Sequence, residues 1–117
     1  MSTNFGIEAD TCARMMDWRH DLHANPETAF EEHRTAQIVA DALMEMQIAV
    51  DRGLGGTGVV GTLKNGEGPS IALRADMDAL NMNELGSSAH KSTREGKKHG
   101  CGHDGHTAML LGAARYL

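Results

Sequence analysis

The feature that most constrains the fold is a change in hydrophobic periodicity near residue 50. Before it, one stretch has the 3.6-residue spacing of an amphipathic helix, with an apolar stripe formed by Ile38, Val39, Ala42, Leu43 and Met46. We expect this helix to end before Val50. After four glycines between positions 53 and 58, the segments 58–63 and 70–75 are predicted to be strands. Amphipathic helices combined with strands predict an α/β fold.

Other local signals complete this outline. A first helix is expected from about Ile7 to Leu22, and Thr28–Glu31 has the pattern of a capping box for the second helix. The Asn65–Gly66 turn predicts that the two strands pair as a hairpin. Apolar residues at helical spacing predict a last helix: Leu110, Ala113, Ala114 and Leu117. No stop signal follows Leu117, so the chain is expected to be cut within this helix.

Composition excludes several classes of function. The chain has 117 residues, of which 40% are hydrophobic and 23% charged, as in one globular domain. Its net charge of -5 argues against nucleic acid as a partner. Neither a membrane-spanning run nor a secretory signal is present in the sequence. Two cysteines far apart do not suggest disulfides, so a reducing, cytoplasmic location is expected.

The segment CGHDGH, residues 101–106, gathers groups that bind metals. Cys101 and His103 are good donors for a divalent transition metal, zinc above all, and Gly102 between them leaves room for the ion. Asp104 is expected either to cap the following helix or to accept a hydrogen bond from a ligand histidine. His106 is a further histidine of this segment. The alternative is that Cys101 is a small buried residue and the histidines lie in a surface loop.

Two aspartates stand at the end of the second predicted strand. Catalytic groups of α/β enzymes are commonly found there, and Asp76 and Asp78 are able to bind a metal or orient a ligand histidine. A solvated loop is the alternative. His20 and His23, at the end of the first helix, are expected to interact with its dipole and last carbonyls.

These motifs together resemble a known family. LRADMDAL (73–80) followed by HGCGHDGHTAMLLGAA (99–114) is similar to metal-dependent amidohydrolases such as hippurate hydrolase, N-acyl-amino-acid amidohydrolases and auxin-conjugate hydrolases, in the zinc aminoacylase and carboxypeptidase superfamily. RHDLHANPETAFEEHRTA (19–36) and GGTGVVGTLKNG (55–66) resemble its N-terminal signature and first hairpin. The loop 81–98 departs from the family: Asn81 replaces a proline, Lys98 an apolar residue, and the loop is unusually basic.

The resemblance implies a catalytic α/β domain with helices packed on a central sheet, two metal ions and an inserted lid or dimerisation domain. Residues 1–117 would then be a truncated N-terminal part of the catalytic domain, without the lid. Cys101 and His103 would be metal ligands, and Asp78 would hold the metal cluster from outside the ligand set. Asp76 takes the position of a ligand histidine in other branches, and no role is carried over for His106.

The implied reaction is hydrolysis of small N-acyl amino acids by a water that the metals activate. The metal is expected to be zinc, with manganese, nickel or cobalt as alternatives, and a homodimer is possible. The family's general-base glutamate follows the histidine motif, so no catalytic residue is expected within this chain; Glu84 and Glu95 lie upstream. We therefore expect the chain alone to bind metal weakly and hydrolyse nothing. The alternative function is a stand-alone, non-catalytic metal-binding or assembly module.

Overall fold

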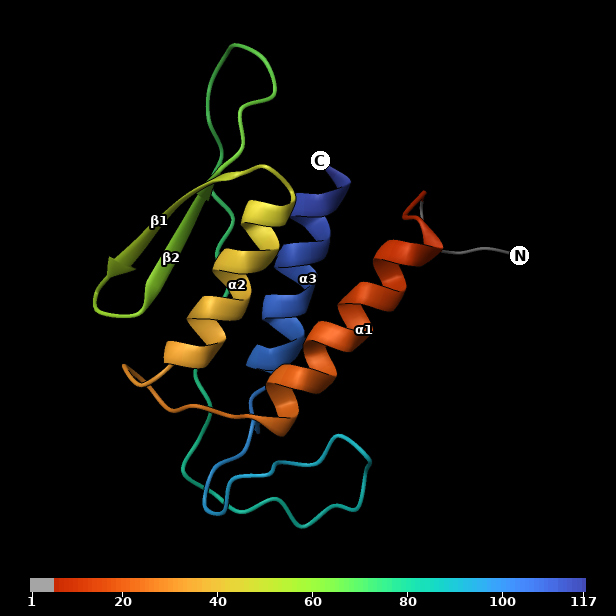
Figure 1. Cartoon of the computed structure of the whole chain (residues 1–117), viewed down its shortest axis with the longest axis vertical. Coiled ribbons are helices and arrows are strands. Elements are labelled where there is room, and N and C mark those ends of the chain that lie inside the picture. The colour runs from red at the N-terminus through yellow and green to blue at the C-terminus, as the bar shows by residue number, and fades with distance from the viewer. Residues whose placement is uncertain (1–5) are drawn as a thin grey trace.

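The computed structural model describes residues 6–117, which form three helices and one two-stranded sheet. The helices are α1 (Ala9–Ala24), α2 (His33–Glu45) and α3 (His103–Tyr116), and the strands are β1 (Ala49–Leu54) and β2 (Gly58–Thr62). In Figure 1, α3 lies between α1 and α2, and α2 packs on the hairpin. The predicted α/β class is confirmed.

The end of α2 follows from local backbone geometry. The helix ends at Glu45, within the predicted limit, because the next residues form a Schellman motif. The N–H of Gln47 donates to the carbonyl of Met44 (2.9 Å), and Gln47 adopts the left-handed φ of 63°. The N–H of Ile48 donates to the carbonyl of Leu43 (3.0 Å). These bonds satisfy carbonyls that the helix leaves free and redirect the chain into β1.

The predicted capping box is wrong in position and in geometry. α2 begins at His33, two residues after the box ends. The hydroxyl of Thr28 donates to the carboxylate of Glu31 (3.0 Å), whereas a capping box needs it to accept from a helical N–H. The Thr28–Glu31 segment therefore forms a local turn rather than the start of a helix.

The start of α2 is capped instead by Glu27, a buried residue in the preceding turn. One carboxylate oxygen accepts from the N–H (2.6 Å) and hydroxyl (2.7 Å) of Thr35, and the other accepts from the N–H of Arg34 (3.0 Å). Burial alone would raise the pKa of Glu27, but these hydrogen bonds outweigh it and lower the pKa. The carboxylate thus satisfies free N–H groups in the first turn and complements the helix dipole.

The predicted hairpin is wrong in its pairing. The strand expected at 58–63 is confirmed as β2, but its antiparallel partner is β1, with Ala49 opposite Thr62. The segment 70–75 forms no strand, and the side chain of Ile71 is 87% exposed. An extended segment becomes a strand only where a neighbour supplies hydrogen bonds. Among the described residues, no strand runs beside 70–75.

The hairpin turn depends on a glycine. A Cβ on Gly58 would lie 2.4 Å from the carbonyl oxygen of Leu54, so Gly58→Ala is expected to lower the free energy of unfolding by about 1–3 kcal/mol. Gly105→Ala is the matched control, because a Cβ there meets no atom within 4 Å. In a helix this change is expected to raise stability by about 0.5–1 kcal/mol. Urea unfolding measures the stability of both variants. Equal changes in the two variants would contradict the predicted clash at Gly58.

The core lies between α2, α3 and the hairpin. Its buried members are Val39, Ala42, Leu43, Ile48 and Leu111. Met77, in the segment that follows residue 75, packs against this core and so draws that segment toward α3. No helix in residues 6–117 is long and apolar enough to cross a membrane.

Candidate metal centre

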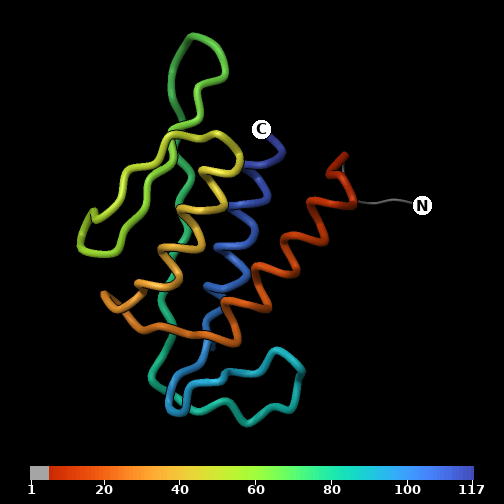
Figure 2. Tube along the Cα trace, in the orientation of Figure 1, coloured from red at the N-terminus to blue at the C-terminus, as the bar shows by residue number. Residues whose placement is uncertain are grey.

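The segment that carries the two aspartates is fixed by backbone hydrogen bonds to distant parts of the chain. The N–H of Ala79 donates to the carbonyl of Glu27 (2.8 Å). Leu80 and Lys98 exchange a pair of N–H···O bonds of 2.8 and 3.0 Å. The trace in Figure 2 shows this segment passing close to the start of α3. Asp78 is thereby held beside the helix that begins with His103.

The strongest contact in the centre joins His103 to Asp78. Nδ1 of His103 lies 3.0 Å from Oδ1 of Asp78 and 2.9 Å from its carbonyl oxygen. Both partners are acceptors, so the contact favours the tautomer in which Nδ1 carries the hydrogen. Nε2 is then left with a free lone pair, which is the arrangement found in metal-bound histidines with a carboxylate partner.

Cys101 lies on the turn that leads into α3. The alternative interpretation, in which Cys101 is a small buried residue, is wrong because Cys101 is exposed. Gly102 has the left-handed φ of 83°, which a side chain would strain, and forms the N-terminal cap of α3. The thiol of Cys101 and the imidazole of His103 therefore flank a tight glycine turn at the N-terminus of α3.

Two other candidates lie at the edge of the centre. The carboxylate of Asp76 forms an ion pair with Arg74 (2.5 Å), an exposed side chain, and its carbonyl accepts from the hydroxyl of Thr107 (3.1 Å). His106 is exposed, and its ring centroid lies 5.7 Å from that of His103. Neither residue has a contact that orients it as firmly as Asp78 orients His103.

Asp104 does neither of the two things expected of it. The N-terminal cap of α3 makes no side-chain hydrogen bond, and within residues 6–117 the carboxylate of Asp104 contacts side chains of α1 rather than a histidine of the 101–106 segment. Its buried carboxylate lies 2.9 Å from Nδ1 of His23 and 3.4 Å from Nε of Arg19, both on α1. The reason is that the first turn of α3 packs directly on α1.

Sequence reasoning missed two buried histidines. His23 was expected at the helix dipole, but it is buried between Asp104 and Glu84. Its position directly after Leu22, which is fully buried, was the sequence signal that could have indicated its burial. His99 is also buried, and within residues 6–117 neither ring nitrogen has a hydrogen-bond partner. Burial lowers the pKa of His99.

The donors present fit a metal as part of a larger set. Cys101 and His103 supply a sulfur and a nitrogen suited to zinc, whereas a closed tetrahedral site needs four ligands. Among residues 6–117, no three His, Cys, Asp or Glu side chains form a group able to hold a metal ion. The chemistry of the pair and the support from Asp78 match a metal site whose remaining ligands come from elsewhere.

Comparison with known proteins identifies relatives of this arrangement. Residues 72–117 match the family model of peptidase family M20/M25/M40. Hippurate hydrolase of Campylobacter jejuni is 51% identical over 100 residues, which cover 85% of this chain and 26% of that protein. An IAA-amino acid hydrolase of Arabidopsis thaliana (ILR1-like 4) is 48% identical over 105 residues, covering 86% of this chain and 24% of that protein.

Comparison of the fold with solved structures also identifies M20 peptidases as relatives. A dinuclear metal-binding peptidase of the M20 family from Bacillus subtilis has a TM-score of 0.89 at 39% identity, covering 93% of this chain and 31% of that one. The resemblance inferred from the sequence is confirmed: the chain is similar in sequence and fold to M20 metallopeptidases and amidohydrolases. It spans about a quarter of the length of the curated relatives it matches.

Proposed function

We propose that this chain, a relative of the M20 metallopeptidases, is the part of a metal-dependent amidohydrolase that supplies Cys101 and His103 as metal ligands. The observation that carries the proposal is the 3.0 Å contact between Nδ1 of His103 and Asp78. It orients the imidazole so that Nε2 is free to bind. The segment bearing Asp78 and the turn bearing Cys101 are both fixed by backbone geometry, so the donors are preorganised.

Each residue has a defined task in this proposal. Cys101 and His103 would hold part of the ligand set of a divalent metal, which would supply a Lewis acid for the substrate carbonyl and lower the pKa of a bound water. Asp78 accepts from Nδ1 of His103, which directs Nε2 away from Asp78 and fixes the plane of the ring. Gly102 lets the thiolate of Cys101 and the imidazole approach the same point. Asp76 and His106 lie close by without an assigned role.

The substrate class proposed is a small N-acyl amino acid, hydrolysed to a carboxylic acid and a free amino acid. Relatives named hippurate hydrolase and IAA-amino acid hydrolase support it, since both names describe an acyl group joined to an amino acid. The general base and remaining ligands would come from outside residues 1–117. Zinc suits the thiolate–imidazole pair best, and a reducing compartment such as the cytoplasm suits a free thiolate.

A chimera tests this function. The matching segment of the Campylobacter hippurate hydrolase is replaced by this chain, and release of glycine from benzoyl-glycine is measured with added Zn²⁺ or Mn²⁺. We expect the chimera to be active and His103→Gln to reduce kcat/KM by about 100-fold or more. His33→Gln, an exposed histidine on α2, is the control and should leave the rate unchanged. A folded, metal-loaded chimera without hydrolysis would contradict the proposal and favour a non-catalytic module.

A further inference from the structure

A buried histidine of α1 contacts two carboxylates that lie 61 and 81 positions further along the chain. Nδ1 of His23 lies 2.9 Å from Asp104, and its Nε2 lies 3.0 Å from one oxygen of Glu84 and 3.1 Å from the other. All three side chains are at most 9% exposed. His23 therefore has a carboxylate at each ring nitrogen and little contact with solvent to replace either partner.

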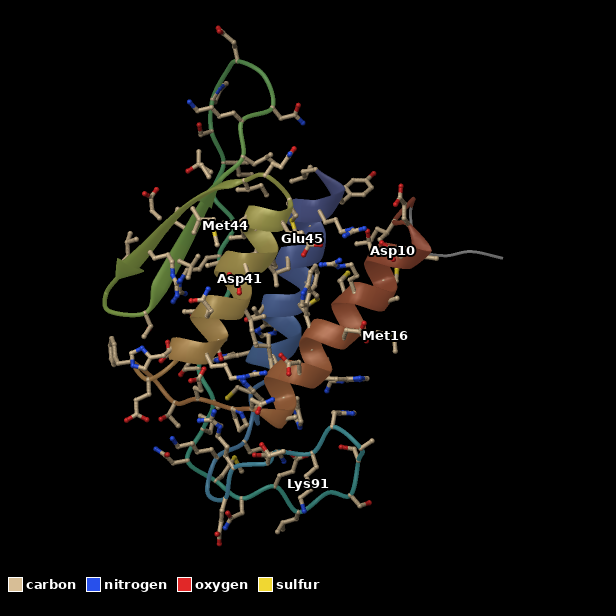
Figure 3. The ribbon with its side chains drawn as sticks, in the orientation of Figure 1. Asp10, Met16, Asp41, Met44, Glu45 and Lys91 are labelled. Atoms are coloured by element: carbon tan, nitrogen blue, oxygen red, sulfur yellow. The ribbon has the colours of Figure 1, made fainter. Side chains whose placement is uncertain are left out.

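The two carboxylates belong to different structural units. Asp104 is in the first turn of α3, next to His103. Glu84 belongs to the loop 81–98, the basic segment that lies below the C-terminal end of α1 and carries Lys91 in Figure 3. Glu84 also accepts from the N–H of Ser92 (2.9 Å), so it ties the two halves of this loop together.

The loop and α1 have a second connection that does not involve His23. The N–H and the hydroxyl of Thr93 donate to the carbonyl of Ala24, at 2.8 and 2.7 Å. His20 stacks on His90 of the loop, with ring centroids 4.1 Å apart. These contacts hold the loop against α1, but neither reaches α3. Within residues 6–117, the side chain of His23 links Glu84 of the loop to Asp104 of the helix that begins with His103.

We propose that His23 is a positioning residue, which makes the geometry of the metal-ligand turn at 101–104 depend on the loop 81–98. The bridge Asp104–His23–Glu84 holds the first turn of α3 through Asp104, the residue next to His103. The orientation of His103 is thus set by the carboxylate of Asp78 at its ring and by a buried link at the neighbouring residue. The role of His23 in metal binding rests on the proposed function, whereas the link between the loop 81–98 and α3 does not.

Hydrogen exchange on the metal-free, 117-residue chain tests the link. The reporter in the ligand turn is the N–H of His106, which donates to the carbonyl of Gly102 (3.0 Å). The reporter in the loop is the N–H of Ser92. In His23→Gln both amides are expected to exchange about 10-fold faster or more. In Glu84→Ala the His106 amide is expected to respond in the same way, although residue 84 is not in α3.

The matched control is His20→Gln, the same substitution one turn earlier on α1. It removes the stack on His90 and leaves the bridge, so the His106 amide should keep its wild-type exchange rate. If His23→Gln accelerates Ser92 alone, the residue serves only the loop and the proposal is wrong. If it accelerates every amide of the core equally, with a matching loss of stability in urea, its role is merely structural and the proposal is also wrong.

Cobalt binding separates this inference from the proposed function. Co²⁺ is added to the chain, and its visible absorption reports affinity and ligand geometry. We expect His23→Gln and Glu84→Ala to weaken Co²⁺ binding about 10-fold and to shift the band, while His20→Gln does neither. If the unmodified chain binds no Co²⁺ because its two donors need the remaining ligands, the exchange experiment decides the link and the chimera decides the proposed function. Unchanged cobalt binding in His23→Gln would overturn the positioning role.

Discussion

Cys101→Ser is expected to lower the affinity of the chain for Co²⁺ or Zn²⁺ by about 100-fold and to abolish the thiolate-to-cobalt absorption band. A serine hydroxyl stays protonated at neutral pH and is a poor ligand for these ions, whereas a thiolate is a strong one. His103 would remain as the other donor, held by Asp78 at 3.0 Å. Titration of the purified chain with Co²⁺ under reducing conditions measures both quantities.

Cys12→Ser is the control for this experiment, since Cys12 is the other cysteine of the chain and lies half-buried on α1. Its replacement should leave the affinity and the spectrum unchanged. Equal losses in the two variants, or unaltered binding in Cys101→Ser, would show that the thiol of residue 101 is not a ligand. Either result would contradict the proposed role of Cys101 in the metal centre.

Glu27→Ala is expected to lower the free energy of unfolding by about 3 kcal/mol at neutral pH. The change leaves the N–H and hydroxyl of Thr35 and the N–H of Arg34 without the carboxylate that accepts from them. Thr35 is 1% exposed, so water does not readily replace that acceptor. Urea unfolding followed by circular dichroism measures the loss. Glu31→Ala removes an exposed carboxylate in the same turn and should leave the free energy of unfolding nearly unchanged.

The contribution of Glu27 should also depend on pH in a defined direction. Its pKa in the folded chain is below the ordinary value of 4.5, so the unfolded chain binds a proton more readily than the folded one. The stabilisation is therefore complete above pH 4.5 and is lost as pH falls through the folded pKa. The difference between wild type and Glu27→Ala should narrow below pH 4.5. A difference that stays constant down to pH 3 would refute the ionic cap.

Local sequence patterns were sufficient to predict that the helices exist and where α2 ends. The stripe ending at Met46 predicted α2, and its end before Val50 is confirmed by the Schellman motif that Gln47 begins. The same local reasoning failed for the start of α2. The cap is Glu27, whose carboxylate lies eight residues before its main partner Thr35, and no short-range rule contains that distance.

Strand pairing could not be derived in the same way. The Asn65–Gly66 turn favoured a hairpin between 58–63 and 70–75, yet β2 pairs with β1 on its other side in sequence. A segment forms a strand only where another segment supplies its backbone hydrogen bonds. The segments before and after β2 in the sequence are both close enough to pair with it, so local pattern does not decide between them. β1 also packs against α2, which the sequence pattern of AVDRGL does not reveal.

For the site, the sequence by itself determined the candidate donors, Cys101 and His103, separated by a glycine that has a left-handed φ of 83° in the structure. That follows from chemistry and spacing within a few residues. Only the tertiary structure decided which groups support them. Asp78 meets His103 across 25 positions and His23 meets Asp104 across 81, because packing of α1 and α3 and backbone pairing of 79 and 80 bring these segments together. Such contacts depend on chain topology, which residue spacing does not encode.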